Sequence, residues 1–275
     1  MKIRLHKNEK LVYACVAGFV IVLLVAGLLL HWQRGAFTSN MLLVLAVVLG
    51  ALFFLEVYLL CTEKEEKYIL EKKRVRSVWR MSMQIVQTLV KTIDAKDSYT
   101  NGHSLRVAKY SVMLGKRLGF SETDLGRLQY IALLHDVGKI GIADNILNKK
   151  GKLTEEEYAI IKSHSSIGAK ILSNISEIPD VATGAKYHHE RYDGTGYPAG
   201  LKGEDIPLIA RIIAVADSYD AMTSKRSYRD ALPQKVVRHE IACGLGSQFD
   251  PVIGKLMLDI IDEDKEYTLQ ELALT

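Results

Sequence analysis

The chain has 275 residues, of which 48% are hydrophobic and 25% are charged, and its formal net charge is +4. This composition excludes a disordered chain and a collagen-like fibre, and three cysteines without a CxxC motif exclude a disulfide framework. The small positive charge is spread among acidic residues, so we expect no nucleic-acid polymer as a partner. The mean hydropathy is nevertheless slightly above zero, which in so charged a chain requires locally apolar segments.

Two apolar segments near the N-terminus predict a transmembrane hairpin in residues 1–61. Residues 11–30 carry no charge and would form a helix about 30 Å long, which matches the hydrocarbon core of a bilayer. Residues 41–60 form a second run of equal length whose only charge is Glu56. We expect Glu56 to reach toward the headgroups, although a contact between helices is the alternative. A cleaved signal peptide is disfavoured because the first run is longer than the roughly 7–15 apolar residues of such a segment.

The orientation of the hairpin follows from its flanks. Four Lys or Arg residues precede the first span, seven follow the second within residues 62–80, and the connecting residues 31–40 contain only Arg34. Because cytoplasmic flanks retain basic residues, both termini and everything after the hairpin should be cytoplasmic. The lipid bilayer is therefore an expected partner.

Residues 62–93 are predicted to form a linker helix. After a charged run, apolar residues recur at spacings of three and four, as at Val75, Val78, Ile85 and Leu89. Such a stripe suits a parallel helix pair that joins two copies into a homodimer, or a single helix packed on its own domain. Ser82 interrupts the heptad, so both interpretations stay open.

Residues 94–275 read as successive helices without sustained alternation of apolar and polar residues, so we predict an all-α domain. Two sequence pairs, Ser121 with Asp124 and Thr154 with Glu157, predict capping boxes that open helices. Gly119 should end the helix that begins at His103.

This domain contains an unusual set of imidazoles and carboxylates beside apolar helical patterns. The set consists of His103, His135, Asp136, His164, His188, His189 and Asp217. One such histidine would be an ordinary core residue, but burying all of them without a cation leaves many polar groups unpaired. Imidazole with carboxylate suits Fe, Mn, Ni or Zn and argues against calcium. Seven ligands are too many for one ion, so we expect two divalent ions that share an aspartate.

Six blocks that follow one another between residues 97 and 251 carry a family resemblance. They are DSYTNGHSLRV, LLHDVGKIGIADNIL, GKLTEEEYAIIKSHSSIGAKIL, YHHERYDGTGYPAGLKGEDIP, ARIIAVADSYDAMTSKRSYR and GSQFDP. The chain thereby resembles the HD-GYP branch of the HD phosphohydrolase superfamily. The resemblance implies a helical HD-GYP domain with a metal centre that hydrolyses cyclic di-GMP, a bacterial second messenger. With the hairpin, it implies a multi-pass protein of the bacterial inner (cytoplasmic) membrane.

The resemblance also assigns roles to single residues. The seven residues of the set look like the metal ligands, with Asp136 or Asp217 as the bridge. Members with a third metal have an acidic residue four positions before the first histidine, where this chain has Tyr99, so we favour two ions, most simply Fe or Mn, with Ni or Zn as alternatives. The expected catalytic residues are Asp136, Asp217 and Lys139, the last holding a nonbridging phosphate oxygen unless it is merely a solvated lysine.

Substrate contacts are expected from the GYP segment and from three arginines. These residues are Gly196, Tyr197, Pro198, Arg211, Arg226 and Arg229. Tyr197 could stack on a purine, whereas each arginine could instead be an ordinary surface charge. Ser227 departs from the common pattern, which has proline there.

The expected reaction is hydrolysis of cyclic di-GMP to pGpG, with further cleavage to GMP left open. Two ions would lower the pKa of a bound water from about 15.7 toward 7, producing a hydroxide that attacks phosphorus, and would clamp the phosphoryl oxygens. The alternatives are another cyclic dinucleotide, such as 3',3'-cyclic GMP-AMP, and a binding module without catalysis. A nucleotidase for nucleoside triphosphates is disfavoured by the GYP segment and the extra histidines.

Overall fold

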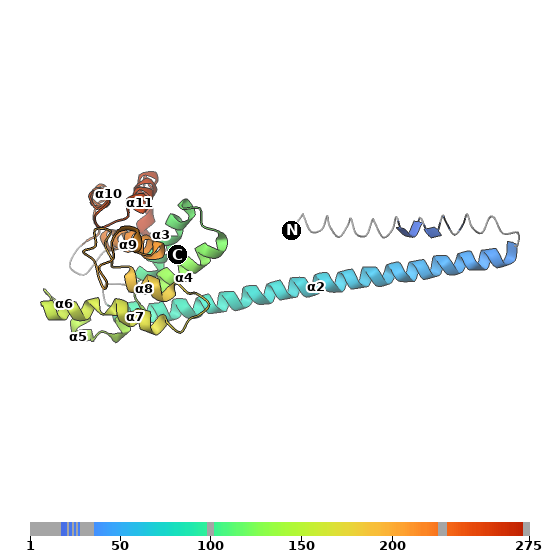
Figure 1. Ribbon diagram of the computed structural model, residues 1–275, viewed down its shortest axis with the longest axis horizontal. Coiled ribbons are helices and arrows are strands. Elements are labelled where there is room, and N and C mark those ends of the chain that lie inside the picture. Colours follow the sequence, from blue (N-terminus) through green and yellow to red (C-terminus); the bar gives the residue numbers. More distant parts are fainter. Residues whose placement is uncertain are drawn as a thin grey trace. The chain divides into compact units, whose positions relative to one another are not determined.

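The computed structural model describes residues 18–20, 22, 23, 25, 27, 36–97, 102–224 and 230–271. The chain divides into two compact units, Met1–Met81 and Ser82–Thr275. The predicted all-α class is confirmed, because in the described residues helices form all the regular structure apart from one isolated bridge between Leu245 and Phe249 (Figure 1).

Helix α2 (Ala36–Lys96) contains both the predicted second span and the predicted linker without interruption. Its apolar part contains no buried residue among those described, and Leu52 and Phe53 are more than half exposed. This part is long and apolar enough to cross a membrane. Of the predicted first span, the described residues are helical and the others lie outside the described part of the chain. The first span, in residues 11–30, and the orientation of the hairpin therefore stay predictions.

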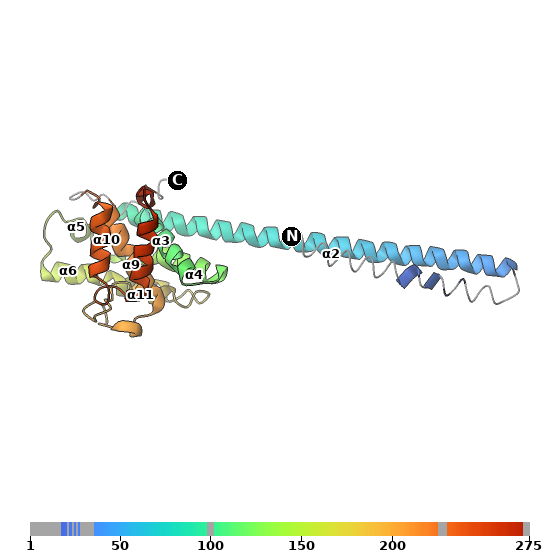
Figure 2. The same ribbon diagram turned by 90° about the horizontal axis from the view of Figure 1, so that it is seen from above.

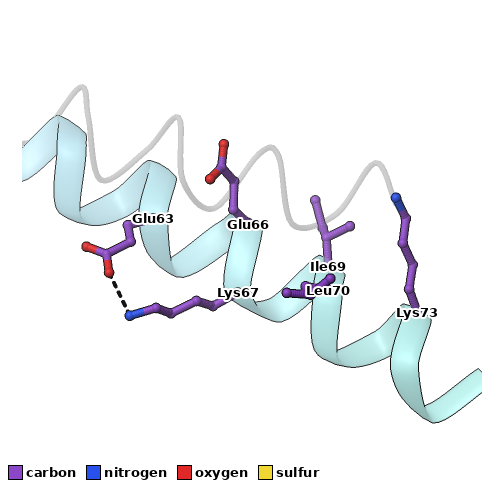
Figure 3. A pocket seen from close by; sticks show the side chains of 6 residues that line it. All are labelled: Glu63, Glu66, Lys67, Ile69, Leu70 and Lys73. Carbon is purple, nitrogen blue, oxygen red and sulfur yellow. Dashed lines mark ion pairs between the residues drawn. The ribbon is translucent and has the colours of Figure 1, made fainter.

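The charged stretch of α2 continues the helix beyond its apolar part. Glu63 and Lys67 form an exposed ion pair of 2.6 Å one turn apart, which supports a solvated helix (Figure 3). A hollow beside the helix is lined by Glu63, Glu66, Lys67, Ile69, Leu70 and Lys73. This lining has no histidine and no set of convergent acids, so it is not the candidate metal site.

The last turns of α2 belong to the second unit. Met83 and Val90 are buried in its core and Ile93 is also buried, whereas Ile85 and Leu89 are more than half exposed. One face of residues 82–93 therefore packs in the core of the second unit, and another face of this stretch is left uncovered in the single chain. The boundary predicted near residue 93 differs from the division at Ser82, since these turns contribute to the core.

The rest of the second unit is a bundle of short helices. The elements are α3 (His103–Arg117), α4 (Glu122–Leu134), η1 (Val137–Gly141), α5 (Asp144–Leu147), α6 (Glu155–Lys162), α7 (His164–Leu172), α8 (Val181–Tyr187), η2 (Gly203–Asp205), α9 (Leu208–Thr223), α10 (Gln234–Cys243), α11 (Pro251–Glu263) and η3 (Thr268–Glu271). Helix α3 packs on α4 and α9, α7 packs on α8 and η1, and α10 packs on α11 (Figure 2). The core between them includes Leu114, Leu128, Ile213 and Tyr219.

The helix ends agree with the local signals except at one cap. Thr154 and Glu157 form the complete capping box at the start of α6, and Gly119 follows α3 with a φ of 79°. At α4, Ser121 accepts a hydrogen bond from the Asp124 backbone, but the Asp124 carboxylate accepts from the Ser121 hydroxyl and not from its backbone N–H. The reciprocal half of this predicted box is wrong, because aspartate is one methylene shorter than the glutamate that such a box uses.

Candidate metal centre

Three of the predicted histidines lie where helices end. His135 caps α4, His188 caps α8, and His164 begins α7 directly after α6. In each ring Nδ1 donates to the carbonyl three residues earlier, which is Ala132 at 2.6 Å, Ala185 at 2.9 Å and Ile161 at 2.6 Å. A carbonyl can only accept, so Nδ1 carries the hydrogen and Nε2 keeps its lone pair. The orphan carbonyls of the helix ends thus orient three potential metal ligands.

All seven predicted ligands come together in two groups. The first consists of His103, His135 and Asp217, and the second of Asp136, His164, His188 and His189. Within each group the ligand atoms lie within 4.8 Å of one another. Asp217 and His189 are partly exposed and the other five are buried, so the site is closed on most sides and reachable at two of its members.

Asp136 lies between the two groups. Its Oδ2 is 3.6 Å from His103 Nε2 and 3.4 Å from His135 Nε2. Its Oδ1 is 3.4 Å from His164 Nε2 and 3.7 Å from His188 Nε2. Each carboxylate oxygen therefore faces one group, which is the geometry that a bridging ligand requires. Asp217 contacts His103 Nε2 at 3.3 Å in the first group, so the geometry favours Asp136 as the bridge.

The electrostatics of the site suit a cation. Burial would lower the pKa of His103, but hydrogen bonds to Asp136 and Asp220 and the charges of Asp220 and Asp217 raise it to about 10. A positive charge is therefore favoured at this point even without a metal.

Two other rings of the site are neutral. Burial lowers the pKa of His164 to about 4 and holds the pKa of His189 well below its usual value, so these rings offer lone pairs. His135 Nε2 is buried without a hydrogen bond, which also fits a metal ligand.

Asp220 and Arg106 complete the first group, and the sequence analysis missed both. Asp220 Oδ2 accepts from His103 Nδ1 at 2.8 Å, and Arg106 Nε donates to Asp220 Oδ1 at 2.5 Å. Asp220 is three residues after Asp217, and Arg106 is three residues after His103. Positions three apart share a helix face, so this spacing could have revealed the pair.

We expect Asp220→Asn to weaken metal binding by about 10–100-fold, because partners behind a metal-bound histidine tune its orientation and basicity to this extent. It should also lower the free energy of unfolding, since the ion pair between the mostly buried Arg106 guanidinium and Asp220 is lost. The measurements are a titration of the metal-depleted full chain with Mn²⁺ and a thermal melt.

Two variants separate the two effects of Asp220. Arg106→Gln breaks the same ion pair but leaves the carboxylate on His103, so it should destabilise the chain with a smaller loss of metal affinity. Asp262→Asn removes an exposed ion pair with Arg238 and should change neither property. Equal metal affinity in Asp220→Asn and the unsubstituted chain would contradict the positioning role.

Lys139 lies in η1, the short helix that directly follows His135 and Asp136. Its Nζ is 2.8 Å from Asp136 Oδ2 and 2.8 Å from Asp97 Oδ2, and its side chain is 17% exposed, so it is not a solvated lysine. At the end of α2, Lys96 Nζ donates to the carbonyls of Lys139, Ile140 and Ile142. The end of α2 therefore holds η1 directly behind the predicted bridge. The phosphate-binding role of Lys139 stays a prediction.

The GYP segment lies against the second group. The Tyr197 ring is 4.8 Å from the His189 ring, and the Tyr197 N–H donates to the His189 carbonyl. A Cβ at Gly196 would lie 2.3 Å from the Arg191 nitrogen, so only glycine fits this approach. Buried Glu190, another residue that the sequence analysis missed, accepts from the backbone of Ala199 and Leu201 at 2.7 and 3.1 Å and holds the loop closed. Pro198 follows Tyr197 on the exposed side of this loop.

Of the three predicted arginines, Arg211 lies within the described residues. Arg211 forms an ion pair with Asp250 and donates to the Ile206 carbonyl at 2.9 Å, so its guanidinium joins two segments of the domain. Its proposed contact with substrate stays a prediction. Arg226 and Arg229 lie outside the described residues, as do Tyr99 and Ser227.

A helical bundle with a buried His–Asp pair at the centre of two ligand groups defines an HD-type metal-site domain. The sequence model of the HD domain family matches residues 87–253, and the chain belongs to this family. The named relatives below support the HD-GYP branch within it.

Two curated relatives illustrate the similarity. The chain is 44% identical over 149 residues to 3'3'-cGAMP-specific phosphodiesterase 3 of Vibrio cholerae. This match covers 54% of this chain and 32% of the relative. It is 40% identical over 188 residues to a cyclic di-GMP phosphodiesterase of Thermotoga maritima. This match covers 67% of this chain and 50% of the relative. The chain thus spans no more than half of the length of either relative.

One solved structure has a similar fold. The crystal structure of a cyclic GMP-AMP-specific phosphodiesterase from V. cholerae matches with a TM-score of 0.51 at 20% sequence identity. The match covers 69% of this chain and 53% of that chain. At this identity the likeness supports the shared fold alone.

Proposed function

We propose that the chain is a metal-dependent phosphodiesterase that opens cyclic di-GMP to linear pGpG. The observation that carries the proposal is the position of Asp136, with one carboxylate oxygen facing each group of ligands. Two adjacent cations sharing a carboxylate suit the displacement at a phosphodiester, because both the attacking and the leaving oxygen need stabilisation. The curated relatives named as cyclic dinucleotide phosphodiesterases support the same reaction.

The roles of the chain's residues follow from this arrangement. His103, His135 and Asp217 would hold one ion, His164, His188 and His189 the other, and Asp136 both. Iron or manganese suits these donors, with nickel or zinc as alternatives. When bound, the two ions would supply an activated water at neutral pH and charge compensation for the phosphoryl oxygens.

Lys139 would complete the compensation of charge at the scissile phosphate. Its ammonium is already oriented by Asp97 and Asp136, each at 2.8 Å, so little side-chain freedom is lost when it acts. The Tyr197 ring beside His189 would pack on a purine of the substrate.

The related substrate 3',3'-cyclic GMP-AMP is a second candidate. The relative that is 44% identical bears the name of a phosphodiesterase for that molecule. Stacking on Tyr197 does not discriminate between guanine and adenine, because every base has a π-face. The two substrates are therefore separated by assay.

The same proposal places the chain at a bacterial inner membrane. Residues 1–61 would form the hairpin, residues 62–93 the linker, whose last turns pack in the core of the domain, and residues 94–275 the rest of the cytoplasmic catalytic domain. The long apolar part of α2 supports one span, and the basic flanks support the orientation. Exposed Val75, Val78, Ile85 and Leu89 on α2 support a homodimer through this helix.

We expect the purified full chain, loaded with Mn²⁺ or reduced iron, to convert cyclic di-GMP to pGpG in a product chromatogram. Cyclic GMP-AMP, incubated in parallel, reports the alternative substrate, and deoxynucleoside triphosphates serve as the negative control. Elemental analysis of the same preparation shows whether the ions are bound. Full metal content without turnover of either dinucleotide would refute the hydrolase, and binding without turnover would identify a binding module.

A further inference from the structure

A cation and two tyrosines gather at the edge of the metal centre. Lys162, in the last turn of α6, places its Nζ 5.0 Å from the ring centre of Tyr158 and 5.9 Å from that of Tyr197. The Tyr197 ring in turn lies 4.8 Å from the ring of His189. A continuous row of side chains therefore leads from the second ligand group to an ammonium on a different helix.

The charge of Lys162 is not neutralised by an acid within the described part of the chain. Its recorded contacts are the two tyrosine rings, which attract a cation only weakly. Lys139 and Lys149, by contrast, both have carboxylate partners within 2.8 Å. A position at a helix C-terminus favours a cation but does not explain why it lies over the loop next to a metal ligand.

The tyrosines add a surface suited to a nucleobase. Tyr158 is 48% exposed although it is aromatic, and Tyr197 is partly buried against His189. An aromatic face beside a free ammonium is the combination that binds a base together with its phosphate. A cyclic dinucleotide carries two phosphates, and the metal centre can hold only the one that is cleaved.

We propose that Tyr158, Lys162 and Tyr197 form a nucleotide subsite in which Lys162 binds the phosphate that is not cleaved and Tyr158 packs on the adjoining base. The proposal rests on the proposed function, because it takes the anion to be the substrate. Lys162 would act on binding and not on the chemical step, since its recorded side-chain contacts in the described residues are with the rings of Tyr158 and Tyr197 and not with a member of the two ligand groups.

The test compares Lys162→Ala with Lys170→Ala in the full chain. Lys170 is also in the last turn of its helix, α7, but it is exposed and has no recorded aromatic contact in the described residues. We expect Lys162→Ala to raise the dissociation constant for cyclic di-GMP, measured by equilibrium dialysis, by about tenfold, which is the typical effect of one charge-assisted contact. KM should rise similarly while kcat and metal content stay within about twofold.

Further readouts exclude a merely structural role. Lys162→Arg should restore most of the affinity. Added salt should weaken the binding of cyclic di-GMP by the unsubstituted chain more than its binding by Lys162→Ala. Tyr158→Ala should also weaken binding, and the melting temperatures of all variants show that they are folded.

The outcomes separate the subsite from the proposed reaction. Unchanged affinity in Lys162→Ala, or an equal loss in Lys170→Ala, overturns the subsite while turnover by the unsubstituted chain leaves the phosphodiesterase intact. If the unsubstituted chain binds cyclic di-GMP without hydrolysing it and Lys162→Ala weakens that binding, the subsite stands and the enzyme fails. If the unsubstituted chain binds no dinucleotide, both fail.

Discussion

Replacing Asp136 with alanine is expected to remove bound metal and phosphodiesterase activity together. Asp136 offers one carboxylate oxygen to each ligand group, so its loss deprives both groups of a ligand. Partners that only support a ligand already change metal affinity by about 10–100-fold, and a shared ligand should exceed that range. The substitution also leaves the buried ammonium of Lys139 with Asp97 as its remaining recorded carboxylate partner, which should lower the free energy of unfolding.

The measurement pairs elemental analysis with a product chromatogram on the same preparation of the full chain. Asp136→Asn tests the charge at nearly constant shape and should behave like the alanine variant. Asp262→Ala, which removes an exposed carboxylate paired with Arg238, should retain both metal and turnover. Full metal content in Asp136→Ala would contradict the assignment of Asp136 as the bridge.

Gly138→Ala should be among the most destabilising single changes in the domain. A Cβ at this position would lie 1.9 Å from the His164 carbonyl oxygen and 2.5 Å from the Gly168 nitrogen. Both are backbone atoms, so α7 must move away from η1. Overpacking of this kind costs about 1–3 kcal/mol, and the backbone contact places the expected loss of unfolding free energy near or above about 3 kcal/mol. His164 would move away from Asp136, so metal affinity should fall as well.

Gly126→Ala is the matched control for that substitution. Gly126 lies within α4, and a Cβ there would have no atom of another part of the protein within 4 Å. Alanine should therefore stabilise the helix by about 0.5–1 kcal/mol. Thermal melts and a Mn²⁺ titration of the two variants check both expectations, and similar melting temperatures would contradict the close approach of η1 and α7.

Two local signals for helix ends, at Thr154 and at Gly119, predict the observed structure. The Thr154 cap and the glycine after α3 depend on atoms a few residues apart, so the sequence contains all that is needed. The continuity of α2 was not apparent, because the change from apolar to charged residues looked like a boundary. Glutamate and lysine are both good helix formers, however, and the helix passes through the charged stretch.

The residues that hold the predicted ligands and the GYP segment in place were harder to predict than the ligands themselves. Histidines and aspartates in apolar patterns are conspicuous, whereas Asp220 resembles any helix-borne acid until its contact with His103 is known. Glu190 likewise gains its role from backbone N–H groups nine and eleven residues later in the chain. Such contacts depend on how the loop closes, which no local pattern encodes.

The amino-acid sequence by itself determined the all-helical class, the long apolar stretch of α2 and the chemical nature of the seven candidate donors. Each of these depends on residue type, periodicity or a short-range hydrogen bond. The tertiary structure alone decided how the donors divide into two groups, that Asp136 and not Asp217 lies between them, and that Lys162 reaches the GYP loop. These relations join residues that are far apart in the chain, and they exist only because the packing of α3, α4, η1, α7, α8 and α9 brings the donor side chains together.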